Sequence, residues 1–210
     1  MIFIDCAQGE PAWHAARTGV CTASRFKDTC DFLKNGKPTQ KNLDYAYDIA
    51  IEMISGETSD DIYITQAMRA GMDREPFARL AYEEKTGNLA EESGIVLTDD
   101  RLFGYSTDGF VGADGLIEIK CLSSSRKIIE MLETGDISDY EHQIQGGMWI
   151  TGRKWCDFIM YVPKLESIGK SLFIKRIERN DEFIDSMVDQ LMDFSRRVES
   201  HVKHLKEKAA

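Results

Sequence analysis

The sequence has few of the features that mark membrane-spanning, secreted or repeat proteins. Only 4 of its 210 residues are prolines, and no stretch is of low complexity or repeats at the period of a solenoid. No apolar run approaches the length that crosses a bilayer, so we expect no membrane contact. The first residues, MIFIDCAQGE, have no basic segment before their short apolar run and do not resemble a signal peptide. These absences favour a single domain over residues 1–210, in the cytoplasm.

Cysteine pairs and positive charge are also scarce. The five cysteines include no Cys-x-x-Cys motif and no accompanying histidine pair, which argues against a zinc site and for reduced thiols. Lys and Arg number 26 against 36 Asp and Glu, a net charge of −10. This balance argues against a nonspecific binder of polyanions. It does not exclude an enzyme acting on DNA, because such an enzyme can confine its basic residues to one groove.

The apolar pattern predicts helices and short strands in the order α–β–β–β–α–β–β–α. Leu43, Tyr47, Ile51 and Ile54 fall on one face of a predicted helix. The later part of the chain contains five strand candidates, namely SGIVLT, LFGYSTD, GLIEIKC, KWCDFIMYVP and SLFIKRIER. A long helix from about residue 181 to 206 follows. This order predicts an α/β (α+β) fold with a mixed sheet flanked by helices.

The stretch STDGFVGADGLIEIKC, residues 106–121, concentrates charge between two predicted strands. Glu118 and Lys120 share one face of the second strand, and the short glycine-rich spacer lets a hairpin bring Asp108 close to Glu118. Paired carboxylates repel each other unless they are protonated or bridged by a cation, and oxygen ligands favour Mg²⁺ or Mn²⁺. The Ile119 carbonyl is a natural extra ligand. Lys120 could orient a water molecule, which suits metal-assisted phosphodiester hydrolysis.

The ordinary interpretation of the same residues is a surface turn. Asp-Gly is a common turn pair, and Glu-x-Lys on a strand is usually a solvated ion pair. The apolar neighbours of the motif, GLI before it and Cys121 after it, favour an inward face instead.

An aspartate, a short spacer and Glu-x-Lys together resemble the PD-(D/E)xK nuclease signature. Thr107 stands where many members carry proline, a position that shapes the strand end and does not bind metal. Three further stretches resemble, in order, blocks of the phage lambda exonuclease or YqaJ-type viral recombinase family: WHAARTGVCTASRF at 13–26, GMDREPFARLAYEEKTG at 71–87 and EHQIQGGMWITG at 141–152. The last third of the chain matches only in its predicted element order.

The resemblance implies a single nuclease domain with a restriction-endonuclease-like core, a central mixed β-sheet flanked by helices. It implies a Mg²⁺-dependent 5′→3′ exonuclease that acts on linear double-stranded DNA and leaves a 3′ single-stranded overhang. Two Mg²⁺ ions per site, replaceable by Mn²⁺, are expected. The family further implies a ring-shaped homotrimer that threads DNA, a single-strand annealing protein as partner, and a phage or prophage gene in a bacterial host.

Family positions also assign the metal site by resemblance. Asp108, Glu118 and the backbone carbonyl of Ile119 match metal ligands, and Glu75 matches the helix carboxylate that completes the set. Lys120 matches the catalytic lysine.

The remaining matches concern substrate. Gln145 aligns with the active-site glutamine of the family, and Gln143 is a near neighbour and a rival. Arg17 and Ser24 match a pocket for the 5′-phosphate, where a guanidinium fork suits the oxygens of a terminal phosphate. Two positions match DNA contacts, an apolar wedge near the opening duplex and a basic residue in a loop: Met68 and Lys34. Gln143 is a third candidate for a DNA contact.

Two other functions compete with the exonuclease. One is a PD-(D/E)xK endonuclease or resolvase with the same metal site. The other is a non-catalytic DNA-end-binding protein with a degenerate site. The presence of Glu75, Asp108, Glu118 and Lys120 together argues against degeneracy.

Overall fold

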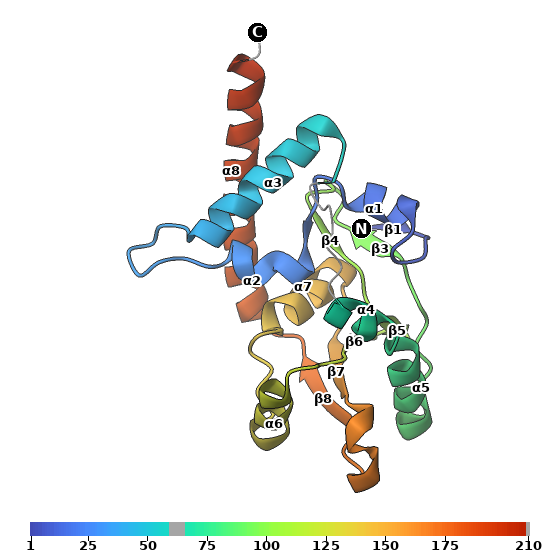
Figure 1. Ribbon diagram of the computed structural model, residues 1–210. Coiled ribbons are helices and arrows are strands. Elements are labelled where there is room, and N and C mark those ends of the chain that lie inside the picture. Colours follow the sequence, from blue (N-terminus) through green and yellow to red (C-terminus); the bar gives the residue numbers. More distant parts are fainter. Residues whose placement is uncertain (59–65, 209–210) are drawn as a thin grey trace.

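Two four-stranded sheets form the centre of the molecule in the computed structural model, which describes residues 1–58 and 66–208 (Figure 1). The first sheet has the order β1-β3-β4-β2, with bounds Ile2–Ile4, Ile95–Leu97, Phe103–Tyr105 and Cys21–Thr22. The second has the order β5-β6-β7-β8, with bounds Gly109–Val111, Gly115–Lys120, Trp155–Tyr161 and Leu172–Glu178. Each sheet includes one parallel pair, β2 with β4 and β6 with β7. The predicted class, a mixed α/β fold flanked by helices, is confirmed.

The single central sheet expected from the sequence is divided in two. The stretch LFGYSTD, predicted as one strand, ends its pairing at Tyr105, and β5 begins separately at Gly109. Strand β4 pairs with β3 of the first sheet, whereas β5 pairs with β6 of the second. The residues between them, 106–108, connect the two sheets and contain the predicted catalytic aspartate.

Helices surround the sheets and begin or end where the sequence places proline and glycine. Their bounds are α1 Pro11–Arg17, η1 Ala23–Arg25, α2 Phe26–Thr29, α3 Gln40–Ser55, α4 Gln66–Met72, α5 Glu75–Thr86, α6 Ser125–Thr134, α7 Glu141–Thr151, η2 Pro163–Ile168 and α8 Asp181–Lys208. Pro76 lies in the first turn of α5, where its missing N–H costs nothing, so it starts a new helix and does not kink a longer one. Gly87 ends α5 at φ 73°, a left-handed conformation that glycine adopts without strain.

Strand β6 is buried on both faces, and this burial places polar groups inside the protein. Leu116 faces a core built with α7, α8 and α3, whereas Ile117 and Ile119 face α5 through Ala78 and Tyr82. A carboxylate in such a strand is costly unless it is fully hydrogen-bonded. The fold therefore forces any charge on β6 to find partners within the protein.

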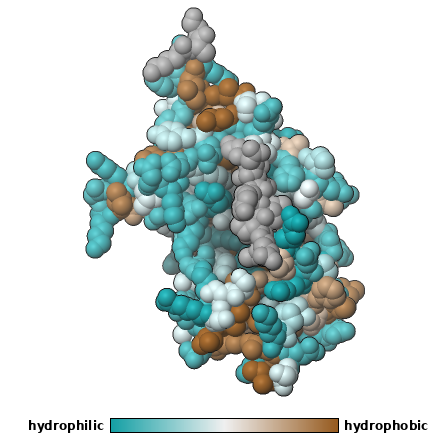
Figure 2. Space-filling model, in the orientation of Figure 1, coloured by the Kyte–Doolittle hydropathy of each residue, from teal (hydrophilic) through white to brown (hydrophobic). Residues whose placement is uncertain are grey.

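The helix predicted around residues 43–54 exists as α3, but the predicted face is not the one that is buried. Ile51 and Ile54 are 54% and 43% exposed. The side chains that α3 buries, largely against α8, are smaller on average: Tyr45, Ala46, Ile49 and Ala50. Alanine lets two helices approach closely, which explains why the larger stripe stays outside. Figure 2 shows further exposed apolar groups near the C-terminal end of α8, where Leu205 is 46% exposed.

Helix α8 spans 28 residues and carries many charged side chains. Neither this helix nor any other described one has the length and apolarity that would let it span a bilayer.

Candidate active site

Asp108 and Glu118 are brought together by the hairpin of β5 and β6. Gly109 pairs with Ile117, so continuing the same register places Asp108 opposite Glu118. The Ile119 amide donates to Asp108 Oδ2 over 2.5 Å. Lys120 shares a face with Glu118, and its Nζ lies 2.6 Å from Glu118 Oε1. The predicted grouping of Asp108, Glu118 and Lys120 is therefore present in the structure.

Thr107 fixes the segment that carries Asp108. Its side chain is buried, and its Oγ1 lies 3.0 Å from the Gly109 carbonyl and 3.2 Å from the Ile117 carbonyl. The Gly109 amide in turn donates to Oγ1 over 3.2 Å. Proline, which many family members carry here, could make none of these side-chain bonds. In this chain the hydroxyl ties the start of β5 to β6 and so holds Asp108 in place.

Glu118 is almost fully buried, with 1% of its surface exposed, and both of its oxygens are hydrogen-bonded. Oε1 accepts from Lys120 Nζ and from Gln143 Nε2, each over 2.6 Å. Oε2 accepts from the Tyr105 hydroxyl over 3.0 Å. These three hydrogen bonds, one of them from a charged donor, offset the cost of burying the side chain.

The structure places Gln143, and not Gln145, against Glu118, because the Gln145 side chain bonds to the segment before α8. Gln145 donates to the Glu178 carbonyl over 3.0 Å and accepts from the Asn180 amide over 2.9 Å. Residues two apart on a helix point about 200° apart, so α7 can direct only one of its two glutamines into the site. Gln143, the rival, is the one that reaches Glu118.

Glu75 is the first residue of α5 and lines the same cleft as Asp108. The cleft has a volume of about 500 Å³ and also includes Arg79. Arg79 Nη2 lies 3.1 Å from Glu75 Oε1, and its Nε donates to the Asp108 carbonyl over 3.2 Å. Arg79 also pairs with Glu92. This guanidinium therefore connects α5 to the segment that carries Asp108.

The surroundings of Asp108 and Glu75 oppose the ionised form of these two carboxyl groups. Burial, followed by the charges of Glu118 and Glu75, holds the pKa of Asp108 well above its usual value. Burial also raises the pKa of Glu75, in part offset by Arg79. Burial alone would lower the pKa of Lys120, but Glu118 and Asp108 raise it above its ordinary value, so the ammonium persists. The site gathers negative charge that a cation would offset.

The donor set fits a hard divalent cation in its chemistry. Carboxylate and carbonyl oxygens are the ligands that Mg²⁺ prefers. Over residues 1–58 and 66–208, however, no three acidic, histidine or cysteine side chains are gathered around one point. Each carboxylate already accepts a hydrogen bond within the protein: Asp108 from the Ile119 amide, Glu75 from Arg79 and Glu118 from Lys120. The ligand positions are thus engaged by the protein itself.

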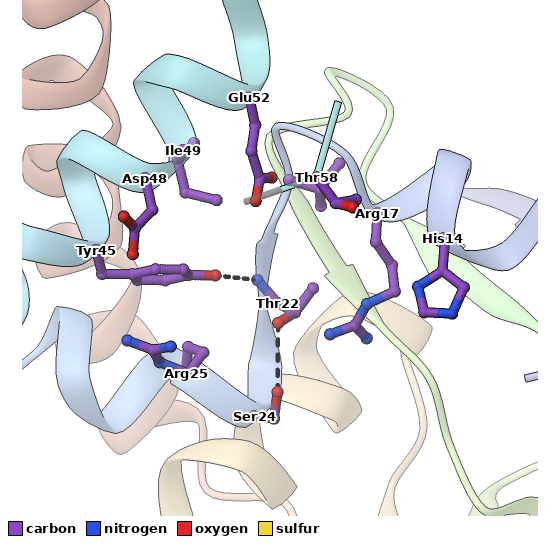
Figure 3. Close-up of a pocket in the computed structure, with 11 residues that line it drawn as sticks. His14, Arg17, Thr22, Ser24, Arg25, Tyr45, Asp48, Ile49, Glu52 and Thr58 are labelled. Carbon is purple, nitrogen blue, oxygen red and sulfur yellow. Dashed lines mark hydrogen bonds between the residues drawn. The ribbon is translucent and has the colours of Figure 1, made fainter. Parts of the chain in front are cut away.

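Arg17 and Ser24 line a second pocket, shown in Figure 3, with a volume of about 180 Å³. Thr22 lies between them, with its Oγ1 3.3 Å from Ser24 Oγ and its amide donating to the Tyr45 hydroxyl over 3.2 Å. Arg25 enters from the opposite side and stacks on Tyr45, 4.2 Å from the ring centre. Two guanidinium groups and two hydroxyl side chains in one pocket suit a phosphate.

Two further features shape this pocket. Ser24 lies within η1, and Thr22 is the N-cap residue of that helix. The wall formed by α3 carries Asp48 and Glu52, and Glu52 accepts from the Gly19 amide over 2.8 Å. The pocket is therefore basic on the side of α1 and η1 and acidic on the side of α3.

Of the predicted DNA contacts, Lys34 lines neither of these two pockets. Lys34 is exposed in the loop between α2 and α3, which projects from the body in Figure 1. Met68 falls in α4, but its side chain lies outside the described part of the chain.

Sequence reasoning missed three residues that shape these sites. Arg79 follows Glu75 by four residues, a helical spacing that could have indicated the pair. Arg25 is adjacent to Ser24 and could have been included with it. Tyr105 carried no such signal, because its contact with Glu118 joins two different sheets.

A lysine beside two carboxylates on a short hairpin, covered by helices, is the arrangement of a nuclease. The chain belongs to the YqaJ-like viral recombinase domain family, whose model matches residues 12–154. This membership and the structural relatives described below make it a DNA exonuclease.

Similar solved structures extend beyond the matched segment. An alkaline exonuclease (LHK-Exo) from Laribacter hongkongensis is 35% identical, with a TM-score of 0.85 over 95% of this chain and 98% of that one. LHK-Exo in complex with dAMP is 34% identical, with a TM-score of 0.86 and the same coverage. A phage related exonuclease from Haemophilus somnus 129PT shares the fold at 15% identity, with a TM-score of 0.69 over 91% of this chain and 96% of that one. No curated protein sequence matches the chain.

Proposed function

We propose that this exonuclease degrades linear double-stranded DNA in the 5′→3′ direction, depends on Mg²⁺ and leaves a 3′ single-stranded overhang. The observation that carries the proposal is the contact between Lys120 Nζ and buried Glu118, which are 2.6 Å apart. Asp108 lies opposite Glu118 on the same hairpin. A lysine in contact with a buried carboxylate, with a second carboxylate opposite on the same hairpin, serves phosphodiester hydrolysis better than it serves stability, because burying charge is costly.

The metal ligands proposed are Glu75, Asp108, Glu118 and the carbonyl of Ile119, holding two Mg²⁺ ions for which Mn²⁺ can substitute. Bound divalent ions supply a Lewis acid for the phosphate and lower the pKa of an attached water molecule. Lys120 remains an ammonium group, so it can orient the attacking water and stabilise charge on the phosphate. Gln143 donates to Glu118 and keeps its carboxylate in place.

The 5′ polarity is supported by the pocket of Arg17 and Ser24. The guanidinium offers paired N–H donors to the oxygens of a terminal phosphate, and the Ser24 hydroxyl offers another donor. LHK-Exo has been crystallised with dAMP, a nucleoside monophosphate of the kind that an exonuclease releases. A phosphate held in this pocket would set which strand end enters the site.

We further propose that three copies form a ring around the DNA and that the enzyme works with a single-strand annealing protein in phage recombination, in the cytoplasm of a bacterial host. A net charge of −10 suits a ring with an acidic exterior and a basic channel. Within that ring, Lys34 is proposed as a basic DNA contact and Met68 as an apolar wedge.

Digestion of end-labelled duplexes tests the proposal. Linear DNA labelled at its 5′ ends should release the label as mononucleotide in Mg²⁺, whereas 3′-labelled strands should become shorter and keep their label. EDTA should stop both reactions. Covalently closed circles are the control and should survive. Cutting of intact circles would instead identify an endonuclease or resolvase. Retention of DNA ends without any release of nucleotides would identify a non-catalytic end-binding protein.

A further inference from the structure

A hydrogen bond from Tyr105 to Glu118 joins the two sheets at the active site. Tyr105 is the last residue of β4 in the first sheet, and Glu118 lies on β6 in the second. The Tyr105 hydroxyl donates to Glu118 Oε2 over 3.0 Å, and both residues are 1% exposed.

The two oxygens of Glu118 have different surroundings. The partners of Oε1, Lys120 and Gln143, are both partly exposed and lie on the open side of the site. The partner of Oε2, Tyr105, is buried in the core. Tyr105 therefore binds Oε2 on the core side of the carboxylate, and Oε1 faces the open side of the site.

The tyrosine ring fits only because α7 carries glycine where it passes. A Cβ atom on Gly147 would lie 2.6 Å from both Cε1 and Cζ of Tyr105, far closer than van der Waals contact allows. Gly147 is buried in the interior of a helix, where glycine is less favourable than alanine. Glycine at this position, although unfavourable for the helix, leaves room for the Tyr105 ring.

We propose that Tyr105 is a positioning residue of the nuclease, that it orients Glu118 as a metal ligand, and that Gly147 provides the space for it to do so. The proposal rests on the metal-dependent function proposed above. It adds that the geometry of Glu118 is set from the first sheet and not only by the motif on β6. Both residues are buried in the protein and act through Glu118.

The test compares Tyr105→Phe with a matched control, Tyr82→Phe. Tyr82 is also buried, and its hydroxyl donates to the buried carboxylate of Asp157 over 2.8 Å, away from Glu118. Both variants lose one buried phenol–carboxylate bond. Mn²⁺ binding without DNA is measured by calorimetry, kcat and KM by digestion of linear duplex, and Tm by thermal unfolding.

We expect Tyr105→Phe to weaken Mn²⁺ binding and lower kcat by about tenfold each, as loss of an outer partner of a metal ligand does, with KM for DNA unchanged. Tyr82→Phe should lower Tm by a similar amount and leave Mn²⁺ affinity and kcat unchanged. If Tyr105→Phe also changes only Tm, Tyr105 is a core residue and the proposal falls. Absence of Mn²⁺ binding and digestion in the unsubstituted protein would overturn the proposed function, and this inference with it.

Gly147→Ala tests the second half without removing the hydroxyl. The added methyl group should displace the ring, so this variant should reproduce the losses in Mn²⁺ affinity and kcat. In the Tyr105→Phe background the same alanine should lower kcat no further, because the bond it disrupts is already absent. Independent, multiplying effects of the two substitutions on kcat would overturn the role given to Gly147.

Discussion

The side-chain amide of Gln143 donates to Glu118 Oε1 over 2.6 Å. We therefore predict that Gln143→Ala lowers kcat by about 10–100-fold, the usual effect of losing an outer partner of a metal ligand. Gln145→Ala is the matched substitution on the same helix. It removes two bonds, to the Glu178 carbonyl and the Asn180 amide, and should lower the free energy of unfolding by roughly 1–3 kcal/mol with kcat preserved. The reverse pattern, measured on folded protein, would restore Gln145 to the site.

Lys120→Ala should abolish cleavage, by at least about 10²-fold, while DNA binding measured by fluorescence anisotropy persists. In the proposed mechanism the ammonium acts on the water and the phosphate, and substrate capture depends on other groups. Lys203→Ala serves as the control, because Lys203 is exposed on α8 and pairs only loosely with Glu207, at 3.9 Å. Turnover retained in the Lys120 variant would remove the lysine from the mechanism.

Arg17→Ala should slow digestion of 5′-phosphorylated ends by about tenfold and affect 5′-hydroxyl ends little, since a hydrogen bond to a charged group contributes roughly 1.5–3 kcal/mol. Arg17→Lys keeps the charge but loses the paired donors. Its rate on 5′-phosphorylated ends should therefore lie between the rates of the unsubstituted protein and of Arg17→Ala. Initial rates on the two kinds of end measure the effect. An equal loss on both ends would reassign Arg17 to general backbone binding.

Asp108→Asn should stabilise the metal-free protein at alkaline pH. The pKa of Asp108 is raised in the folded state, so its contribution to stability is fully present below the ordinary carboxyl pKa of about 4 and is lost as pH rises through the raised value. In EDTA at pH 8 the asparagine should raise Tm by several degrees, since ~1 kcal/mol corresponds to about 2–4 °C for a chain of this size. At pH 4 the two proteins should unfold alike.

Asp114→Asn is the control for this comparison. Asp114 lies in the same hairpin but pairs at the surface with Lys154, 3.1 Å away. Its substitution should not raise Tm at pH 8. A lower Tm for Asp108→Asn than for the unsubstituted protein at that pH would contradict the raised pKa.

Local patterns predicted the parts of the fold that depend on local sequence. The alternation in GLIEIK placed Glu118 and Lys120 on one face of β6, and the glycine-rich spacer gave the hairpin that carries Asp108. Strands β1 and β2, of three and two residues, were not predicted because they are short and their partners, β3 and β4, are distant in sequence.

The errors concern which face of an element points inward. Nothing in the order of residues separates Gln143 from Gln145, because the rotation of α7 is set by its packing. Gly146 lies against Phe26 and Gly147 against Tyr105, and these contacts come from other parts of the chain. On α3 the larger apolar stripe is exposed for a similar reason, since α8 selects the face with alanines.

Arg79 links three stretches of chain that line the cleft beside Asp108. Its planar guanidinium bonds the side chains of Glu75 and Glu92 together with the backbone beside Asp108, so three separate stretches of chain share a single rigid clamp. A lysine has a compact ammonium group in place of the planar guanidinium, so it could not make these three contacts together. A displacement of α5 would therefore move the backbone at Asp108 as well, so the positions of Glu75 and Asp108 are coupled through Arg79.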